Sequence, residues 1–238
     1  MQAGTPAVDG NTLQLANAAR DASMVPLPQS LADPESVMKL YYLKGACSLA
    51  SHIALYETGL KFEVSAIDRA NRKTSEGDAF DEINTKGYAP TLRLDSGELL
   101  TENVAVLQYV ADLAPASKLA PPAGTMARYR LIEWLAYINS EVHKAVSPLF
   151  NAAAPDDVKT YARTYVTKRT DWLEKHFGKG PFLMGEQLTV ADCYLFVVFG
   201  WFARVGLDQS KWPTLKAFHQ RVAARPAAQS AMKVEGLI

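Results

Sequence analysis

The sequence predicts a small α/β unit followed by an all-helical unit, and three observations support this fold class. Segments with strand and helix character alternate between residues 38 and 114. The stretch PASKLAPPAG (115–124) is rich in Pro and Ala and lacks hydrophobic periodicity, as expected at a boundary between domains. Beyond it, every periodic segment repeats its apolar residues at helical spacing. We therefore expect one domain over 38–117 and a second over 125–238.

The α/β unit is predicted to run strand, helix, strand, helix, strand, strand and helix. The predicted strands are short and either apolar or alternating: KLYYL (39–43), KFEVSAID (61–68), APTLRLD (89–95) and ELLTE (98–102). The last two are joined at Ser96-Gly97, which is typical of a hairpin turn. The predicted helices are SLASHIALYETG (48–59), a short stretch after the polar loop 69–78, and NVAVLQYVADLA (103–114).

The second unit is predicted to be helical throughout. Its helices are expected over 125–152, 156–177, 189–204, 213–224 and 229–234. In LTVADC, Thr189 and Asp192 have the spacing of a capping box, in which each side chain bonds the backbone amide of the other residue. The helix that follows is apolar nearly all round, so we expect it to run through the core. Its Cys193 is then a core side chain.

The composition excludes several classes of protein. Lys and Arg together number 25, as do Asp and Glu, so the chain has no basic excess for binding nucleic acid. No stretch approaches the ~20 apolar residues of a membrane span. The histidines are scattered and no Cys-x-x-Cys pair occurs, so no metal site is predicted. Two cysteines are too few for a disulfide framework, which favours a reducing compartment, the cytoplasm.

Residues 1–37 differ from the rest of the chain. They mix small, polar and Pro residues without sustained periodicity. The first basic residue is Arg20, and Asp9 interrupts the apolar part, so the segment lacks the basic start and apolar stretch of a secretory signal. We interpret it as a flexible or loosely docked extension.

Cys47 lies where an apolar strand gives way to a helix, in YLKGACSLASH. Two interpretations are open. A free cysteine is usually buried and behaves as a small apolar side chain. At a helix start, however, the unpaired amides and the helix dipole favour an anion, and a thiol whose pKa falls from ~8.5 to ~6.5 is mostly thiolate at pH 7. The second interpretation makes Cys47 a reactive sulfur.

Two further corners of the α/β unit are suited to contact a ligand. Pro90, in GYAPTL, opens a strand, where a proline marks an edge, a bulge or a cis turn. A cis turn would leave the backbone of Ala89 free beside the Cys47 loop. In TEN, Asn103 can cap the next helix and Glu102 can hold an ammonium group. Each feature alone also has an ordinary structural interpretation, so the indication lies in their combination.

Residues 38–238 resemble a bacterial glutathione transferase of the beta class. The resemblance rests on four stretches taken together: MKLYYLKGACSLASHIAL, NTKGYAPTLRLDSGELLTENVAVLQYVADLAP, EVHKAVSPLF and LTVADCYLFVV. It implies a thioredoxin-like N-terminal domain, an all-helical C-terminal domain and a homodimer. It also implies glutathione as a co-substrate, a small hydrophobic electrophile as the second substrate, and no metal.

The resemblance also implies roles for individual residues. Cys47 is expected beside the sulfur of glutathione, with which it can form a mixed disulfide, and His143 near both sulfurs as a hydrogen-bonding partner. Lys144 completes the family's His-Lys pair among the glutathione-binding residues, and Trp201 borders the pocket for the hydrophobic substrate. Glutathione itself would be held by Ala89 and Pro90 at a cis peptide bond, by Glu102 and Asn103 at its γ-glutamyl end, and by Arg72 at its glycyl end.

The predicted function is that of a glutathione S-transferase. It would conjugate glutathione to hydrophobic electrophiles, catalyse thiol–disulfide exchange through Cys47, or both. Two alternatives stay open at this point: a glutathione-dependent lyase or dehalogenase of an aromatic catabolite, and a non-catalytic glutathione- or ligand-binding protein of the same fold. The second draws support from Asn103, which stands where the family usually has Ser or Thr, and from the added N-terminal segment.

Overall fold

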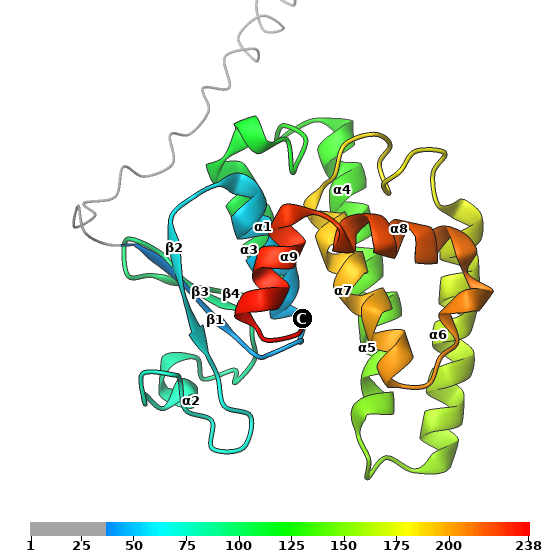
Figure 1. Ribbon diagram of the computed structural model, residues 1–238, viewed down its shortest axis with the longest axis horizontal. Helices are drawn as coiled ribbons and strands as arrows, with labels where there is room; N and C mark the ends of the chain where they lie inside the picture. Colours follow the sequence, from blue (N-terminus) through cyan, green and yellow to red (C-terminus); the bar gives the residue numbers. More distant parts are fainter. Residues whose placement is uncertain (1–36) are drawn as a thin grey trace, which may run out of the picture.

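The structure, a computed structural model, describes residues 37–238, so the predicted extension lies outside the described residues apart from Val37. The N-terminal unit is built on a four-stranded sheet in the order β2-β1-β3-β4 (Figure 1). Its strands are β1 (Met38–Tyr42), β2 (Phe62–Ala66), β3 (Thr91–Arg93) and β4 (Leu99–Thr101). β1 and β2 are parallel, whereas β3 pairs antiparallel with both β1 and β4. All the predicted strands are present.

Helices cover both faces of this sheet. They are α1 (Ser48–Thr58), α2 (Phe80–Ile83) and α3 (Asn103–Leu113). α1 and α3 pack together on one face, and the short α2 lies on the other (Figure 1). The alternation of β1 explains this division. Leu40 and Tyr42 join the main core, whereas Tyr41 packs with Ile67 and Phe80 in a separate cluster.

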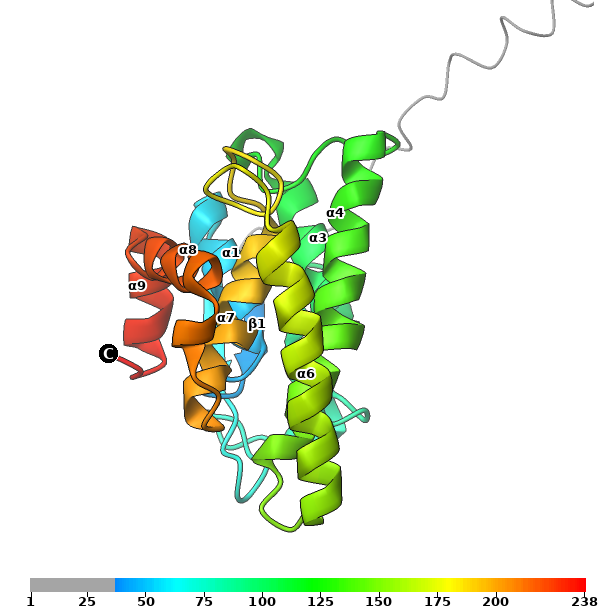
Figure 2. The same cartoon turned by 90° about the vertical axis from the view of Figure 1, so that its right-hand side faces the viewer.

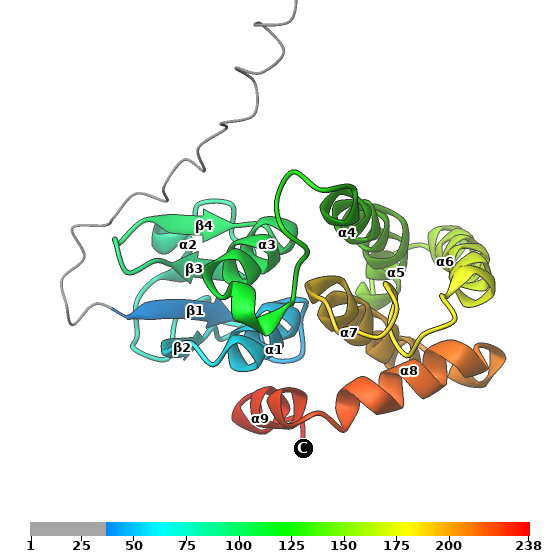
Figure 3. The same ribbon diagram turned by 90° about the horizontal axis from the view of Figure 1, so that it is seen from above.

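The second unit is helical, and the predicted fold class is confirmed. Its elements are α4 (Met126–Tyr137), a π-helical segment (Ile138–His143), α5 (Lys144–Val146), α6 (Asp156–His176), α7 (Val190–Arg204), α8 (Pro213–Ala223) and α9 (Pro226–Val234). α7 lies between α4 and α8, and α6 packs against α5 and α8 (Figure 2, Figure 3). Within residues 37–238, no helix has the length and apolar character needed to cross a membrane.

The segment predicted to be helical over 125–152 is helical from Met126 to Phe150, but its winding changes along the way. After α4 the chain widens into the π-helical segment, where the amide of Lys144 donates to the carbonyl of Asn139. A π-helical turn adds a residue to the helix, and such turns occur frequently at functional sites. This one contains His143.

The predicted capping box at the start of α7 is confirmed. The amide of Thr189 donates to the Asp192 carboxylate at 2.8 Å, and the side chain of Thr189 bonds the amide of Asp192 in return. Asp192 is inaccessible to solvent, and burial raises the pKa of its carboxyl to about 6. Because both partners are buried, the box fixes where the central helix begins.

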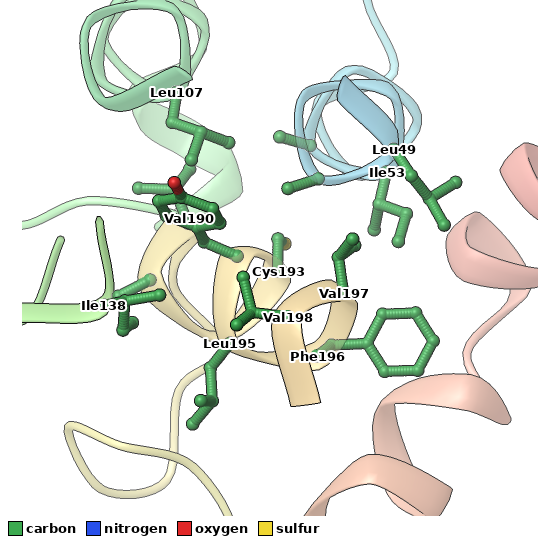
Figure 4. Packing of buried hydrophobic residues seen from close by; sticks show 14 of the residues in the cluster. Leu49, Ile53, Leu107, Ile138, Val190, Cys193, Leu195, Phe196, Val197 and Val198 are labelled. Carbon is green, nitrogen blue, oxygen red and sulfur yellow. The ribbon is translucent and has the colours of Figure 1, made fainter. Parts of the chain in front are cut away.

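α7 also joins the two units. Cys193 is fully buried on it, as predicted. Figure 4 shows Leu49 and Ile53 of α1 pointing toward Val197 of α7. At the end of the second unit, α9 packs against α1 from another side (Figure 3). Two helices of the second unit therefore hold α1, whose first turn follows Cys47.

Candidate active site

Cys47 is the N-cap residue of α1, at the end of a tight turn that follows β1. The turn is closed by the Ala46 amide, which donates to the Leu43 carbonyl at 2.9 Å. Gly45 has a φ of +65°, and a Cβ at this position would lie 3.3 Å from the guanidinium of Arg204. A glycine is therefore needed here for both the turn and the close approach of Arg204.

The sulfur of Cys47 faces the predicted proline corner. Its thiol donates to the carbonyl oxygen of Ala89 at 3.3 Å, and the Ala89–Pro90 peptide bond is cis. The side-chain amide of Asn84 supports this corner by donating to the Tyr88 carbonyl at 2.9 Å. The structure thus brings the sulfur and the cis corner together.

The prediction that the helix start holds Cys47 as a thiolate is wrong. Burial raises the pKa of the Cys47 thiol to about 11, and the backbone amides of Cys47 and Ser48, with Lys144, oppose this rise only in part. Loss of hydration disfavours the charged sulfur more than the helix start favours it. The hydrogen bond to Ala89 agrees, because a thiol donates to a carbonyl and a thiolate cannot. Cys47 is therefore protonated at neutral pH.

His143 is held as a neutral imidazole. Its Nδ1 lies 2.6 Å from the hydroxyl of Tyr194, which itself donates to Oδ1 of Asn139 at 2.9 Å. Since the hydroxyl gives its one proton to Asn139, Nδ1 carries the imidazole proton and Nε2 is the acceptor. Burial, with a smaller contribution from Lys144, lowers the pKa of His143 to about 4. His143 can therefore accept a hydrogen bond at Nε2, and it is a weak base at neutral pH.

Three side chains of the C-terminal unit hold the backbone of Gly45, and we call them the Gly45 clamp: Trp201, Arg204 and Glu235. The Gly45 carbonyl accepts from the Trp201 indole at 3.0 Å and from the Arg204 guanidinium at 3.2 Å. The Gly45 amide donates to Glu235 at 2.8 Å. The other oxygen of that carboxylate lies 3.0 Å from Nδ1 of His52, and both side chains are inaccessible to solvent.

Sequence reasoning missed two members of the clamp. Arg204 carried a signal, because it follows Trp201 by three residues on a helix and so lies on the same face. Glu235 carried none, since it is 190 residues from Gly45 and only the tertiary fold brings the two together.

A cleft of about 770 Å³ opens between the two units beside these groups. Of the predicted site residues, Cys47, His143 and Trp201 line it. The His143 ring packs against the Trp201 indole with 4.8 Å between ring centroids, and the Phe150 ring lies 5.7 Å from the same indole. The cleft therefore combines a thiol, a neutral imidazole and an aromatic wall.

The residues predicted for the γ-glutamyl end lie outside the lining of the cleft. Glu102 is the N-cap of α3, has a φ of +71° and pairs with Lys86 at 3.2 Å. Asn103 does not cap the helix as predicted. It is the first residue of α3, and its buried side chain accepts a hydrogen bond from Ser51 of α1 at 2.7 Å. The side chain thus packs inward, which leaves the backbone amide at the helix start.

Arg72 is engaged by Asp81 of α2 and by Gly87, which follows α2. Its guanidinium lies 2.6 Å from Asp81 and donates to the Gly87 carbonyl at 2.7 Å. The structure therefore does not bring Arg72 to the cleft. Lys144, in contrast, is exposed next to His143 and close enough to Cys47 to lower the pKa of its thiol.

The sequence matches two family profiles. Residues 36–112 match the glutathione S-transferase N-terminal domain, and residues 137–226 match the glutathione S-transferase C-terminal domain. The chain is also similar to glutathione S-transferase GstA of Escherichia coli O157:H7. The two are 41% identical over 200 residues, which cover 84% of this chain and 100% of the relative.

Solved structures show the same similarity. A ternary complex of BphK, a bacterial glutathione S-transferase, has 50% identity, a TM-score of 0.81 and coverage of 83% of this chain and 99% of that one. The beta-class glutathione S-transferase of Sphingomonas chungbukensis has 48% identity, a TM-score of 0.81 and coverage of 84% and 100%.

Proposed function

This chain belongs to the glutathione S-transferase family and is similar to its bacterial beta class, and from that premise we propose that it joins glutathione to small electrophiles in the cleft beside Cys47. The observation that carries the proposal is that Cys47 and His143 line one cleft next to the cis Ala89–Pro90 corner. Relatives named glutathione S-transferase match over their whole length, which favours an enzyme of this kind over a lyase, a dehalogenase or a non-catalytic binding protein.

We propose that glutathione binds along the α/β unit with its sulfur next to Cys47. The backbone of Ala89 pairs with the cysteinyl part, as its carbonyl already accepts from the Cys47 thiol. At the γ-glutamyl end, Glu102 releases Lys86 and pairs instead with the ammonium group of glutathione. Asn103 contributes its backbone amide, because a helix start favours a carboxylate.

The glycyl end of glutathione requires a second exchange. Arg72 is paired with Asp81, and both side chains are partly or largely exposed. An exposed ion pair contributes little net free energy, so a glycyl carboxylate can replace Asp81 at small cost. We assign Arg72 to the glycyl end on this basis.

The chemical step needs a hydrogen-bond acceptor and a donor near the glutathione sulfur. Nε2 of the neutral His143 accepts a hydrogen bond from the glutathione thiol and orients it. The thiol proton passes to water as the sulfur attacks the electrophilic carbon, and the leaving group departs with its bonding electrons. The Cys47 thiol, protonated at neutral pH, gives up its bond to the Ala89 carbonyl and donates its one proton as a hydrogen bond to the developing thiolate. Lys144 adds positive charge nearby, and Trp201 packs against the apolar part of the electrophile.

The test is conjugation of glutathione with 1-chloro-2,4-dinitrobenzene, together with mass spectrometry after exposure to oxidised glutathione. We expect His143→Ala to lower kcat by about fivefold to tenfold, the contribution of one hydrogen bond of ~1 kcal/mol, with glutathione binding retained in calorimetry. Cys47→Ala should abolish the mixed disulfide while leaving part of the conjugation activity. Adduct formation on Cys193 in the wild type, or absence of glutathione binding, would contradict the proposal.

We also propose that the protein is a homodimer in a reducing compartment, the cytoplasm. Both cysteines are free. Met126 and Tyr129 on α4 are 66% and 57% exposed, and such apolar surface suits contact with a second copy. Sedimentation of the purified chain at the mass of one copy would contradict the dimer.

A further inference from the structure

The cleft carries three cations that the transfer mechanism does not use. Lys44, Arg69 and Arg204 line it, and no Asp or Glu does. In the part of the chain that the structure describes, none of the three forms an ion pair. His143, the other titratable base of the lining, is neutral there. The cleft is therefore electropositive and attracts an anion.

An aromatic wall leads from the reacting sulfur to one of these cations. His143 contacts Trp201, the Phe150 ring lies 5.7 Å from Trp201, and the Arg204 guanidinium lies 5.5 Å from the centre of the Phe150 ring. Phe150 is 44% exposed, so its ring is free to pack against another flat ring. A planar molecule on this wall has one end near Cys47 and the other near Arg204.

Arg204 has hydrogen-bond donors to spare. Its Nη1 donates to the Gly45 carbonyl, which holds the guanidinium in place at the cleft. A guanidinium has five N–H donors in a planar fork that matches a carboxylate. Lys44 adds a second positive charge to the lining of the cleft.

We propose that the second substrate is an anionic aromatic electrophile, an aryl halide with a carboxylate on the side of the ring away from the reacting carbon. The ring packs on Phe150 and Trp201, and the carboxylate binds Arg204. The glutathione sulfur forms a C–S bond with the ring carbon, the halide leaves with the electron pair of its bond, and the thiol proton passes to water. This inference rests on the proposed transferase function and narrows the hydrophobic electrophile expected from the sequence.

The test compares 4-chloro-3-nitrobenzoate with 4-chloro-3-nitrobenzamide, which has a similar shape but no charge. After each kcat/KM is divided by the uncatalysed rate with glutathione, we expect the wild type to favour the benzoate by about tenfold or more. Arg204→Ala should remove most of this preference, measured as the ratio of the two kcat/KM values. The variant also loses one hydrogen bond to the Gly45 carbonyl, which lowers kcat/KM for both substrates alike and cancels in that ratio. Arg204→Lys should keep part of the preference, because it retains the charge without the fork.

Arg163→Ala is the matched control. Arg163 is also an exposed arginine that donates to one backbone carbonyl near the end of α7, that of Val205 at 2.8 Å, but it lies outside the cleft. We expect the preference for the benzoate to be unchanged in this variant. An equal loss for both substrates in Arg204→Ala, or no preference in the wild type, would overturn the proposal.

A binding measurement separates this proposal from the transferase function. Calorimetry with 4-methyl-3-nitrobenzoate and 4-methyl-3-nitrobenzamide, which have no leaving group, is performed on the protein saturated with glutathione. If the benzoate binds more tightly than the benzamide, and Arg204→Ala removes this difference, the anion site is supported. If in addition neither aryl chloride is turned over, the proposed transferase function fails but the anion site does not. Equal binding of the two compounds overturns the anion site.

Discussion

The two sides of the Cys47 sulfur are built in opposite ways. On one side, the Gly45 clamp bonds the loop backbone, and its carboxylate is buried with no alternative partner. On the other side, Glu102 and Arg72 are accessible and paired with Lys86 and Asp81. The loop that carries the sulfur is therefore fixed before a ligand arrives, whereas the groups proposed for the charged ends of glutathione exchange one partner for another. Because the loop with Cys47 is already ordered, glutathione loses less entropy when it binds. Glu102 and Arg72 keep their charges paired with Lys86 and Asp81 while no glutathione is bound.

Replacing Glu235, on the fixed side, should lower the stability of the protein more than any substitution on the exchanging side. Glu235→Ala leaves the Gly45 amide and Nδ1 of His52 buried without this partner, and each buried polar group left unsatisfied costs about 1–3 kcal/mol. Urea unfolding followed by circular dichroism should show a lower midpoint. Glu235→Gln should lose less, because its amide oxygen can still accept from one of the two groups.

Glu186→Ala is the matched control for that measurement. Glu186 is exposed in the loop before α7, and an exposed substitution of this kind usually changes stability by less than about 0.5 kcal/mol. Equal stability of the Glu235→Ala and Glu186→Ala variants would mean that the clamp does not hold the loop.

On the fixed side, the rate at which Cys47 reacts should depend on pH in a way that reports the burial of its sulfur. Because burial raises the pKa of this thiol to about 11, its thiolate fraction grows about tenfold per pH unit below that value. The rate at which oxidised glutathione modifies Cys47 should therefore keep rising from pH 7 to pH 10. A thiol with an ordinary pKa of ~8.5 would level off by about pH 9. Rates of adduct formation measured by mass spectrometry would contradict the buried thiol if they reached that earlier plateau.

The smallest effects are expected on the exchanging side. Arg72→Ala removes an ion pair worth about 0–1 kcal/mol in exposed settings and a hydrogen bond to the Gly87 carbonyl worth about 0.5–1.5 kcal/mol, so the unfolding midpoint should move less than in Glu235→Ala. KM for glutathione should rise by about fivefold, the equivalent of one hydrogen bond of ~1 kcal/mol. Asp81→Asn releases Arg72 and should lower KM or leave it unchanged. If both variants raised KM equally, the pair would be a support for the loop and not a site of exchange.

Local features of this fold were predictable, and features set by distant contacts were not. The capping box of Thr189 and Asp192 lies within one helical turn, so its spacing was visible in the sequence. The N-cap position of Cys47 followed in the same way from the change of periodicity after β1. The thiol pKa did not follow, because it depends on what packs around the sulfur.

The residues of the candidate site also divide into those that were predictable from the sequence and those that are set by distant contacts. Cys47 was identified by its place at a helix start, and His143 and Trp201 through a family resemblance. The structure places all three around one cleft. The bond of Gly45 with Glu235 and the inward packing of Asn103 depend on residues of another helix or another domain. No local pattern carries that information.

The π-helical segment has a consequence for how the imidazole is aimed. Each residue in an α-helix advances the direction of its side chain by about 100°, so the single residue added by a wide turn rotates everything after it by that amount relative to a regular helix. His143 closes this turn. Its orientation is thus an outcome of backbone winding, and the bond with Tyr194 secures an angle that the main chain has already set.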